Sequence, residues 1–121
     1  MDNEKYAMYI IINDDLKMSS GKIASQVGHL TEKMAETILS SIYEGSDSRD
    51  LQIAYFKYST SGRKKVILKG SYKEMFAYLK DTECIHIIDE GLTEIPPDSL
   101  TVIGFYPSNK NKEKFKKFRL L

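Results

Sequence analysis

The sequence predicts an α/β fold with a mainly parallel or mixed sheet. Short apolar or β-branched segments alternate with segments of helical periodicity, which is the pattern of strands and helices in one layered sheet. The 121 residues, 41% of them hydrophobic, are enough to bury one core. No internal repeat and no low-complexity linker divides the chain. We therefore expect one domain, residues 1–121.

The first half of the chain is expected to contain one strand and two helices. Residues 6–12 are almost wholly apolar, which is typical of a strand covered on both faces, so this strand should be central. Ser19 and Ser20 are helix-start residues, and apolar side chains follow at helical spacing from residue 21 to about 43. Residues 49–58 fit a short helix or a strand, and we favour the helix. The apolar positions of the long helix are Ile23, Val27, Leu30, Met34, Ile38 and Ile42.

The second half is expected to contain three strands and a helix. Ser71 is a helix-capping residue, and the helix should run to about residue 80. Pro96 and Pro97 force an irregular connection before the last strand. The tail, residues 109–121, fits a short basic helix. The strand segments are 65–69, 84–89 and 101–106.

The net charge of +1 divides unevenly along the chain. Residues 1–62 hold 6 Lys and Arg against 9 Asp and Glu, a net −3, whereas residues 63–121 hold 12 against 8, a net +4. In the tail, six basic residues and one acidic residue are interleaved with Phe115 and Phe118. The basic half either faces a polyanion or carries ordinary solvated lysines. The tail likewise either binds a polyanion or docks through its aromatic residues.

Composition also indicates the compartment. Cys84 is the single cysteine, so no intrachain disulfide is possible and a reducing, cytoplasmic environment is favoured. The longest apolar run, residues 7–12, is far shorter than the roughly 18 residues that a membrane span needs. We expect neither a membrane helix nor a secretory signal.

A polar stripe is expected beside the apolar stripe of the long helix. Lys22, Gln26, His29 and Lys33 fall within about 60° of one another when 100° is allowed per residue. The start of the helix at Gly21 and Lys22 adds backbone N–H groups and a positive dipole end, which suit a phosphate or an oxyanion. A nucleotide-binding P-loop is rejected, because its first glycine and its hydroxyl are replaced by Leu16 and Ile23.

A second group of polar residues begins at Asp89, at the carboxyl end of a predicted strand. In α/β sheets, ligands gather beyond such ends. Asp89 would face Lys22 if its strand runs parallel to residues 6–12, and Thr93 and Thr101 would bring hydroxyls to the same rim. The alternatives are a turn motif at Asp89 and Thr93 and a hydrogen-bonded core-edge role for His29.

Other chemistries find less support. His86 lies inside a strand-like segment, and we expect a structural role for it. The two histidines and one cysteine offer no metal-ligand spacing, so no metal is expected. No G-x-S-x-G nucleophile elbow is present, although a Ser-His-Asp triad stays open.

These motifs, in this order, resemble the archaeal and eukaryotic family of peptidyl-tRNA hydrolases. The similarity spans essentially the whole chain and is weakest at residues 44–62. The motifs that carry it are DLKM, GK-I-A-x-Q-x-x-H, KKVILK, D-x-G-x-T-E-I-P-P, TVIG and a chain end in LL.

The resemblance implies a fold, an activity and a set of site residues. The fold is a four-stranded mixed sheet flanked by helices on both faces, commonly as a homodimer. The activity is hydrolysis of the ester of peptidyl-tRNA, which releases the peptide and free tRNA without cofactor or metal. The implied catalytic residues are Lys22, Asp89, Thr93, Thr101 and His29. The candidate substrate-binding residues, chosen from the charge pattern and the start of the long helix, are Lys17, Ser20, Gly21, Gln26, Lys64 and Lys65.

The chain departs from the family pattern at four positions. They are Asn13 for arginine, Ser25 for alanine, Asp98 for glycine and Tyr106 for the glycine that normally precedes the proline. We expect Asp98 and Tyr106 to border the site and to affect substrate fit rather than chemistry. The alternatives to an enzyme are a non-catalytic RNA- or protein-binding module of the same fold and an adaptor that binds an acidic partner through the basic tail.

Overall fold

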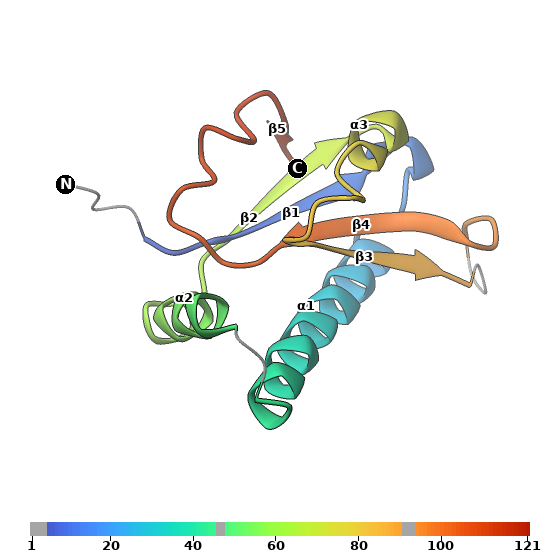
Figure 1. The fold of residues 1–121 in the computed structure, drawn as a ribbon. Coiled ribbons are helices and arrows are strands. Elements are labelled where there is room, and N and C mark those ends of the chain that lie inside the picture. Colours follow the sequence, from blue (N-terminus) through green and yellow to red (C-terminus); the bar gives the residue numbers. More distant parts are fainter. Residues whose placement is uncertain (1–4, 46–47, 91–93) are drawn as a thin grey trace.

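A five-stranded mixed sheet forms the centre of the protein (Figure 1). The computed structural model describes residues 5–45, 48–90 and 94–121. The strands are β1 (Met8–Asn13), β2 (Lys65–Gly70), β3 (Cys84–Asp89), β4 (Ser99–Phe105) and β5 (Arg119–Leu120). The helices are the 3-10 helix η1 (Asp14–Leu16) and the α-helices α1 (Ser20–Tyr43), α2 (Arg49–Thr60) and α3 (Tyr72–Phe76).

The strand order places three carboxyl ends at one edge of the sheet. The order is β3-β4-β1-β2-β5, so β1 is central, as its apolar sequence predicts. Strand β2 pairs with β1 in parallel, and β4 pairs antiparallel with both β1 and β3. Hence β1, β2 and β3 run in the same direction. We call the boundary of the sheet at which these three strands end the carboxyl edge. It runs across the strand ends and is distinct from the outer strands of the sheet.

Each face of the sheet is covered by different segments. Helices α1 and α2 lie on one face, and α3 and the C-terminal segment, residues 107–121, lie on the other (Figure 1). Side chains of β1 alternate between the two cores. Ile10 and Ile12 pack toward α1 and α2, whereas Ile11 packs with Phe115 and Phe118 of the C-terminal segment. This two-sided burial explains the almost continuous apolar sequence of β1.

Helix α1 follows the predicted pattern over most of its length. The Ser19 side chain accepts a hydrogen bond from the backbone N–H of Lys22 at 3.2 Å and so caps the helix. Leu30 is fully buried against β4, where a Cβ at Gly104 would collide with the Leu30 side chain. Ile42 departs from the expected apolar stripe, because 56% of it is exposed near the end of the helix. None of the described helices is both long and apolar enough to cross a membrane.

Two predicted helices differ in the structure. The helix after Ser71 ends at Phe76 rather than near residue 80, and turns follow it. The basic tail forms turns and then strand β5 instead of a helix. Pairing of β5 with β2 satisfies backbone groups that would otherwise be unpaired at the sheet edge. This pairing also adds a fifth strand to the four that were expected.

Candidate functional site

The candidate site lies at the carboxyl edge, where the first turn of α1 meets the end of β3. Lys22 Nζ donates a hydrogen bond to Asp89 Oδ1 at 3.1 Å. The two side chains are 11% and 15% exposed, so water screens the ion pair less than it would a surface pair. The prediction that a parallel β3 would bring Asp89 to the start of this helix is confirmed.

Two buried side chains, Gln26 of α1 and Thr101 of β4, orient the carboxylate of Asp89 from the interior of the protein. Gln26 Nε2 donates to the same Oδ1 atom at 3.2 Å. Thr101 Oγ1 donates to Gln26 Oε1 at 2.7 Å and also lies 3.3 Å from the carbonyl oxygen of Ile87. Because the Thr101 hydroxyl holds the oxygen end of the amide, the amide NH₂ is directed at Asp89. We call Lys22, Gln26, Asp89 and Thr101 the carboxylate cluster.

Burial changes the expected place of two of these residues. Gln26 is 1% exposed and Thr101 is fully buried, so both lie beneath the rim at which they were expected. In this position, their polar atoms can hold Asp89 in one orientation. An unpaired polar atom would be costly there, which favours a complete chain of hydrogen bonds.

The segment after Asp89 is tied to the start of α1 by Glu94. The Glu94 carboxylate accepts from the backbone N–H and from the hydroxyl of Ser19, each at 2.7 Å. The backbone bond, followed by the hydroxyl bond, holds the pKa of Glu94 below its usual value. Ser19 also caps α1 through Lys22, so one serine links Glu94 to the turn that carries the site lysine. No role for Glu94 was predicted from the sequence, although Glu94 is the last residue of the D-x-G-x-T-E motif.

Asn13, where the family pattern has arginine, joins neighbouring elements beneath the site. Its side-chain Nδ2 donates to the carbonyl oxygen of Leu100 at 2.8 Å, and its Oδ1 accepts from the backbone N–H of Asp15 at 3.0 Å. These bonds fix the end of β1 against β4 and against η1. The departure therefore has a structural use in this chain.

Three predicted residues lie on the exposed surface around the cluster. Ser20 and Gly21 form the exposed first turn of α1, beside Lys22. Lys17 has a left-handed backbone with φ of 49° and pairs with Asp14 at 3.3 Å. All three are thus available to a substrate at the carboxyl edge.

Two of the predicted catalytic residues are not part of the cluster as described. His29 is exposed, and its Nε2 lies 3.5 Å from the hydroxyl of Ser25. Among the described contacts, His29 touches no member of the carboxylate cluster. Thr93 lies outside the described residues.

Other predicted residues lie at the opposite edge of the sheet. Lys65 is in register with Met8 at the start of β1, so Lys64 and Lys65 are separated from the cluster by the length of β2. Tyr106 follows the last residue of β4 and lines a groove with α2, so the expectation that it borders the site is wrong. β4 runs antiparallel to β1, which places its end at that opposite edge. Asp98 does border the site, because it precedes Ser99, the partner of Asp89 across β3 and β4.

The cluster offers groups suited to acyl transfer. A carboxylate, an ammonium and the N-terminus of a 24-residue helix meet at one partly buried point. Such an arrangement can hold a water molecule and stabilise a developing oxyanion. In residues 5–45, 48–90 and 94–121, no three His, Cys, Asp or Glu side chains come together in a way that could hold a metal ion.

Comparison with known proteins identifies the family of the chain. The family model described as peptidyl-tRNA hydrolase PTH2 matches residues 6–121. A peptidyl-tRNA hydrolase of Staphylothermus marinus is 34% identical over 117 residues, which cover 91% of this chain and 88% of that protein. A peptidyl-tRNA hydrolase of Methanococcus maripaludis strain C6 is 34% identical over 116 residues, 88% of this chain and 90% of that protein. A probable peptidyl-tRNA hydrolase 2 of Caenorhabditis elegans is 34% identical over 107 residues, 84% of this chain but 32% of that protein.

Proposed function

The chain belongs to the PTH2 family of peptidyl-tRNA hydrolases, and from this we infer that it cleaves the ester bond between a peptide and its tRNA. The observation that carries the proposal is the Lys22–Asp89 pair at the N-terminus of α1. Both residues lie in the motifs that carry the family resemblance. The products are a free peptide and a tRNA that can be charged again.

In the proposed reaction, a water oxygen bonds to the ester carbonyl carbon and the bond from that carbon to the ribose oxygen breaks. One proton of the water ends on the ribose oxygen, which leaves as a hydroxyl, and the other is released to solvent, so that the peptide leaves with a carboxylate. Such a reaction needs a positioned water, a proton acceptor and a donor for the tetrahedral oxyanion.

We assign these tasks to the carboxylate cluster and to Thr93. Asp89, together with Thr93, holds the attacking water. Lys22 and the N-terminal N–H groups of α1 stabilise the oxyanion or the neighbouring phosphate. What supports this role for Lys22 is that an ammonium carries three N–H donors, and its described contact with Asp89 uses one.

The buried members of the cluster act on Asp89. Gln26, anchored by Thr101, keeps the carboxylate in the orientation that holds the water. His29 assists from the exposed surface of α1, at the next turn after Gln26. Its exposure there supports contact with the substrate.

Substrate contacts are proposed at two distances from the ester. Lys17, Ser20 and Gly21 contact the end of the tRNA close to the reacting bond, because they surround Lys22 at the carboxyl edge. Lys64 and Lys65 contact the tRNA backbone farther away, at the other end of β2. The double variant Lys64→Ala, Lys65→Ala should weaken binding for all tRNAs alike and flatten the dependence of log affinity on log salt, by roughly 0.7 to 0.9 per lost phosphate contact.

We also propose that the chain works in the cytoplasm as a homodimer. The family resemblance supports a dimer, and Leu39, Ile42 and Tyr43 of α1 are exposed apolar side chains that a second copy would cover. Sedimentation equilibrium would give twice the chain mass of 13.9 kDa for a dimer. A mass of one chain at working concentrations would contradict it.

Turnover of purified peptidyl-tRNA tests the function itself. The chain should release the peptide catalytically, and free amino-acid esters serve as the control for unspecific esterase activity. Binding of the substrate without release would favour a non-catalytic module instead.

A further inference from the structure

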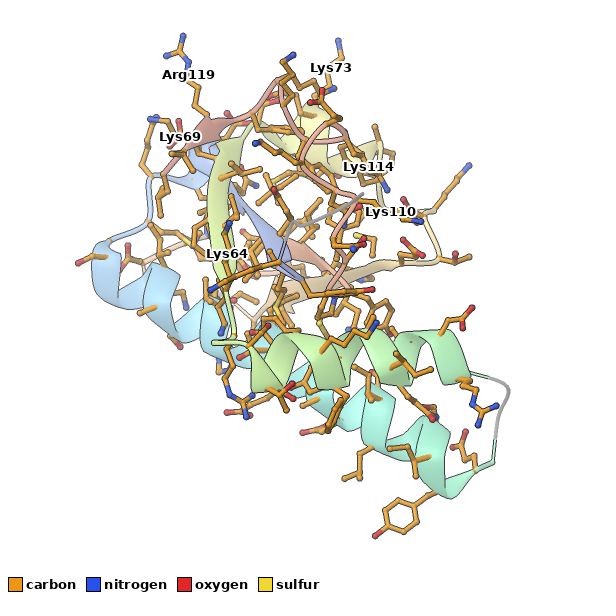
Figure 2. The ribbon with its side chains drawn as sticks, turned by 90° about the vertical axis from the view of Figure 1, so that its left-hand side faces the viewer. Lys64, Lys69, Lys73, Lys110, Lys114 and Arg119 are labelled. Carbon is orange, nitrogen blue, oxygen red and sulfur yellow. The ribbon has the colours of Figure 1, made fainter. Side chains whose placement is uncertain are left out.

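Two cations lie directly opposite each other across strands β2 and β5. Lys69 and Arg119 are register partners in this antiparallel pair. Figure 2 shows both side chains at the same end of β2, with Lys64 at the other end. Side chains of such partners lie roughly 5 Å apart at Cβ, and like charges in this position are destabilising. Two positive charges thus stem from directly opposed positions of the two strands.

The cation pair lies on the same face of the sheet as the carboxylate cluster. Ile67 of β2 packs in the core beneath α1, and alternate residues of a strand share a face, so Lys69 is on that side. Arg119, as its cross-strand partner, is on that side too. Lys69 also lies near the end of β2, at the carboxyl edge. Three strand spacings of about 4.8 Å separate β2 from β3, which puts Asp89 roughly 15 Å away.

A hollow of about 330 Å³ lies beside the pair, and Lys117 is a third cation in its wall. Three carboxylates also line this hollow, and each has a partner of its own. Asp14 pairs with Lys17 at 3.3 Å, Asp15 accepts from the backbone N–H of Tyr72 at 2.9 Å, and Glu74 accepts from the backbone N–H of Ser71 at 2.9 Å.

Lys69 and Arg119, by contrast, lack such partners. In the described part of the chain, neither of them forms an ion pair. Lys117 interacts with Glu74: hydrogen bonds from Ser71, and then the charge of Lys117, hold the pKa of Glu74 below its usual value. Lys117 lies over the rings of Tyr78 and Phe118, which hold its stem beside the hollow. A further anion would relieve the repulsion between Lys69 and Arg119.

We propose that Lys69, Arg119 and Lys117 form a phosphate subsite for the tRNA backbone, a few nucleotides from the ester. This inference rests on the proposed function and deepens it, because it states where the tRNA leaves the reacting centre. The C-terminal segment continues the subsite: residues 107–121 hold six Lys and Arg and one Glu, a net +5 in a chain of net +1. Such a concentrated charge, carried on the face of the sheet opposite α1, attracts a polyanion to the β2–β5 side of the protein.

The double variant Lys69→Gln, Arg119→Gln tests the subsite without removing side-chain length. The KM for peptidyl-tRNA should rise on the order of ten-fold with kcat nearly unchanged, because phosphate contacts add affinity and not chemistry. The slope of log(kcat/KM) against log salt should become shallower by roughly 1.5, which corresponds to the loss of two phosphate contacts. Turnover of a short peptidyl-nucleotide ester should not change, because that substrate ends before the subsite.

The matched control is Arg49→Gln, Lys57→Gln on α2, which removes the same charge near the opposite edge of the sheet. It should leave KM and the salt slope near those of the wild type. The melting temperature of the subsite variant should be unchanged or higher, since a like-charge pair is removed. A lower melting temperature of the subsite variant would overturn the subsite. An equal rise in KM in the control variant, or a loss of turnover on the short ester, would overturn it too.

Binding of uncharged tRNA, followed by fluorescence anisotropy, separates the two proposals. Weaker binding by the Lys69 and Arg119 variant alone supports the subsite whether or not the wild type hydrolyses the ester. Wild-type binding by this variant would overturn the subsite. Absence of hydrolysis by the wild type would instead contradict the proposed function.

Discussion

Lys22 Nζ lies 3.1 Å from Asp89 Oδ1, and this contact joins the first turn of α1 to the last residue of β3. The two residues are 67 positions apart in the sequence. The fold brings them together because β3 runs parallel to β1 and because α1 starts just beyond the end of β1. Any change that moves the start of α1 relative to β3 should therefore affect turnover.

Thr101→Val tests the support beneath Asp89. The substitution keeps the shape but removes the hydroxyl that holds Gln26 Oε1 at 2.7 Å, and it leaves that buried oxygen without its described donor. The free energy of unfolding should fall by about 1–3 kcal/mol and turnover by on the order of ten-fold. Urea unfolding and kcat measure the two effects. Thr60→Val, which removes an exposed hydroxyl bonded to the carbonyl oxygen of Phe56 within α2, is the control, and equal effects in both variants would count against a role for Thr101.

Ser19→Ala tests the cap of α1. The variant loses the bond to the Lys22 N–H and one of the two bonds to Glu94. Stability should fall by about 1 kcal/mol, and turnover should fall as well because the turn that carries Lys22 is less well fixed. Ser40→Ala, at an exposed position in the last turn of the same helix, should change neither quantity. Unchanged turnover in Ser19→Ala would show that the cap is not needed to place Lys22.

His86 should make folding stability depend on pH. Burial, and secondarily the charge of Lys33, lowers the pKa of His86 below its usual 6.5. The unfolded chain then binds more protons than the folded chain below about pH 6.5, so stability should fall as the pH falls through that range. In His86→Gln, the loss of unfolding free energy between about pH 7.5 and about pH 5.5 should be smaller. An equal loss in the variant would mean that other groups cause the dependence.

Activity should not depend on a bound metal ion. The described residues contain no cluster of His, Cys, Asp and Glu that could hold one. Incubation with about 1 mM chelator should leave the rate of peptide release unchanged. A loss of activity that added zinc or magnesium restores would refute this.

Much of the fold follows from local patterns that the sequence displays. The apolar run of β1, the periodicity of α1 and the serine before it predicted a central strand and a capped helix, and both are present. Helix α2, favoured over a strand at residues 49–58, is also confirmed. These elements were predictable because their signals come from neighbours in the sequence.

The remaining differences arise from contacts between distant residues. The tail has the charge and spacing of a basic helix, but its last residues gain more from pairing with β2. Helical spacing placed Gln26 on the rim of α1, whereas the buried hydroxyl of Thr101 provides it with a partner inside. Likewise, nothing local to Lys69 or Arg119 indicates that they face each other. Such pairs are set by strand register, which a single sequence does not display.

The most direct test of the account is a double-mutant cycle on Lys22 and Asp89, read as the rate of peptide release from purified peptidyl-tRNA. Lys22→Ala and Asp89→Ala should each lower kcat by on the order of 10² or more with the fold intact. The double variant should be hardly slower than either one, because the two groups act as a unit. Lys73→Ala, an exposed lysine of α3 on the other face of the sheet, is the control. Near-wild-type release by both single variants would contradict the assignment of the reaction to this pair.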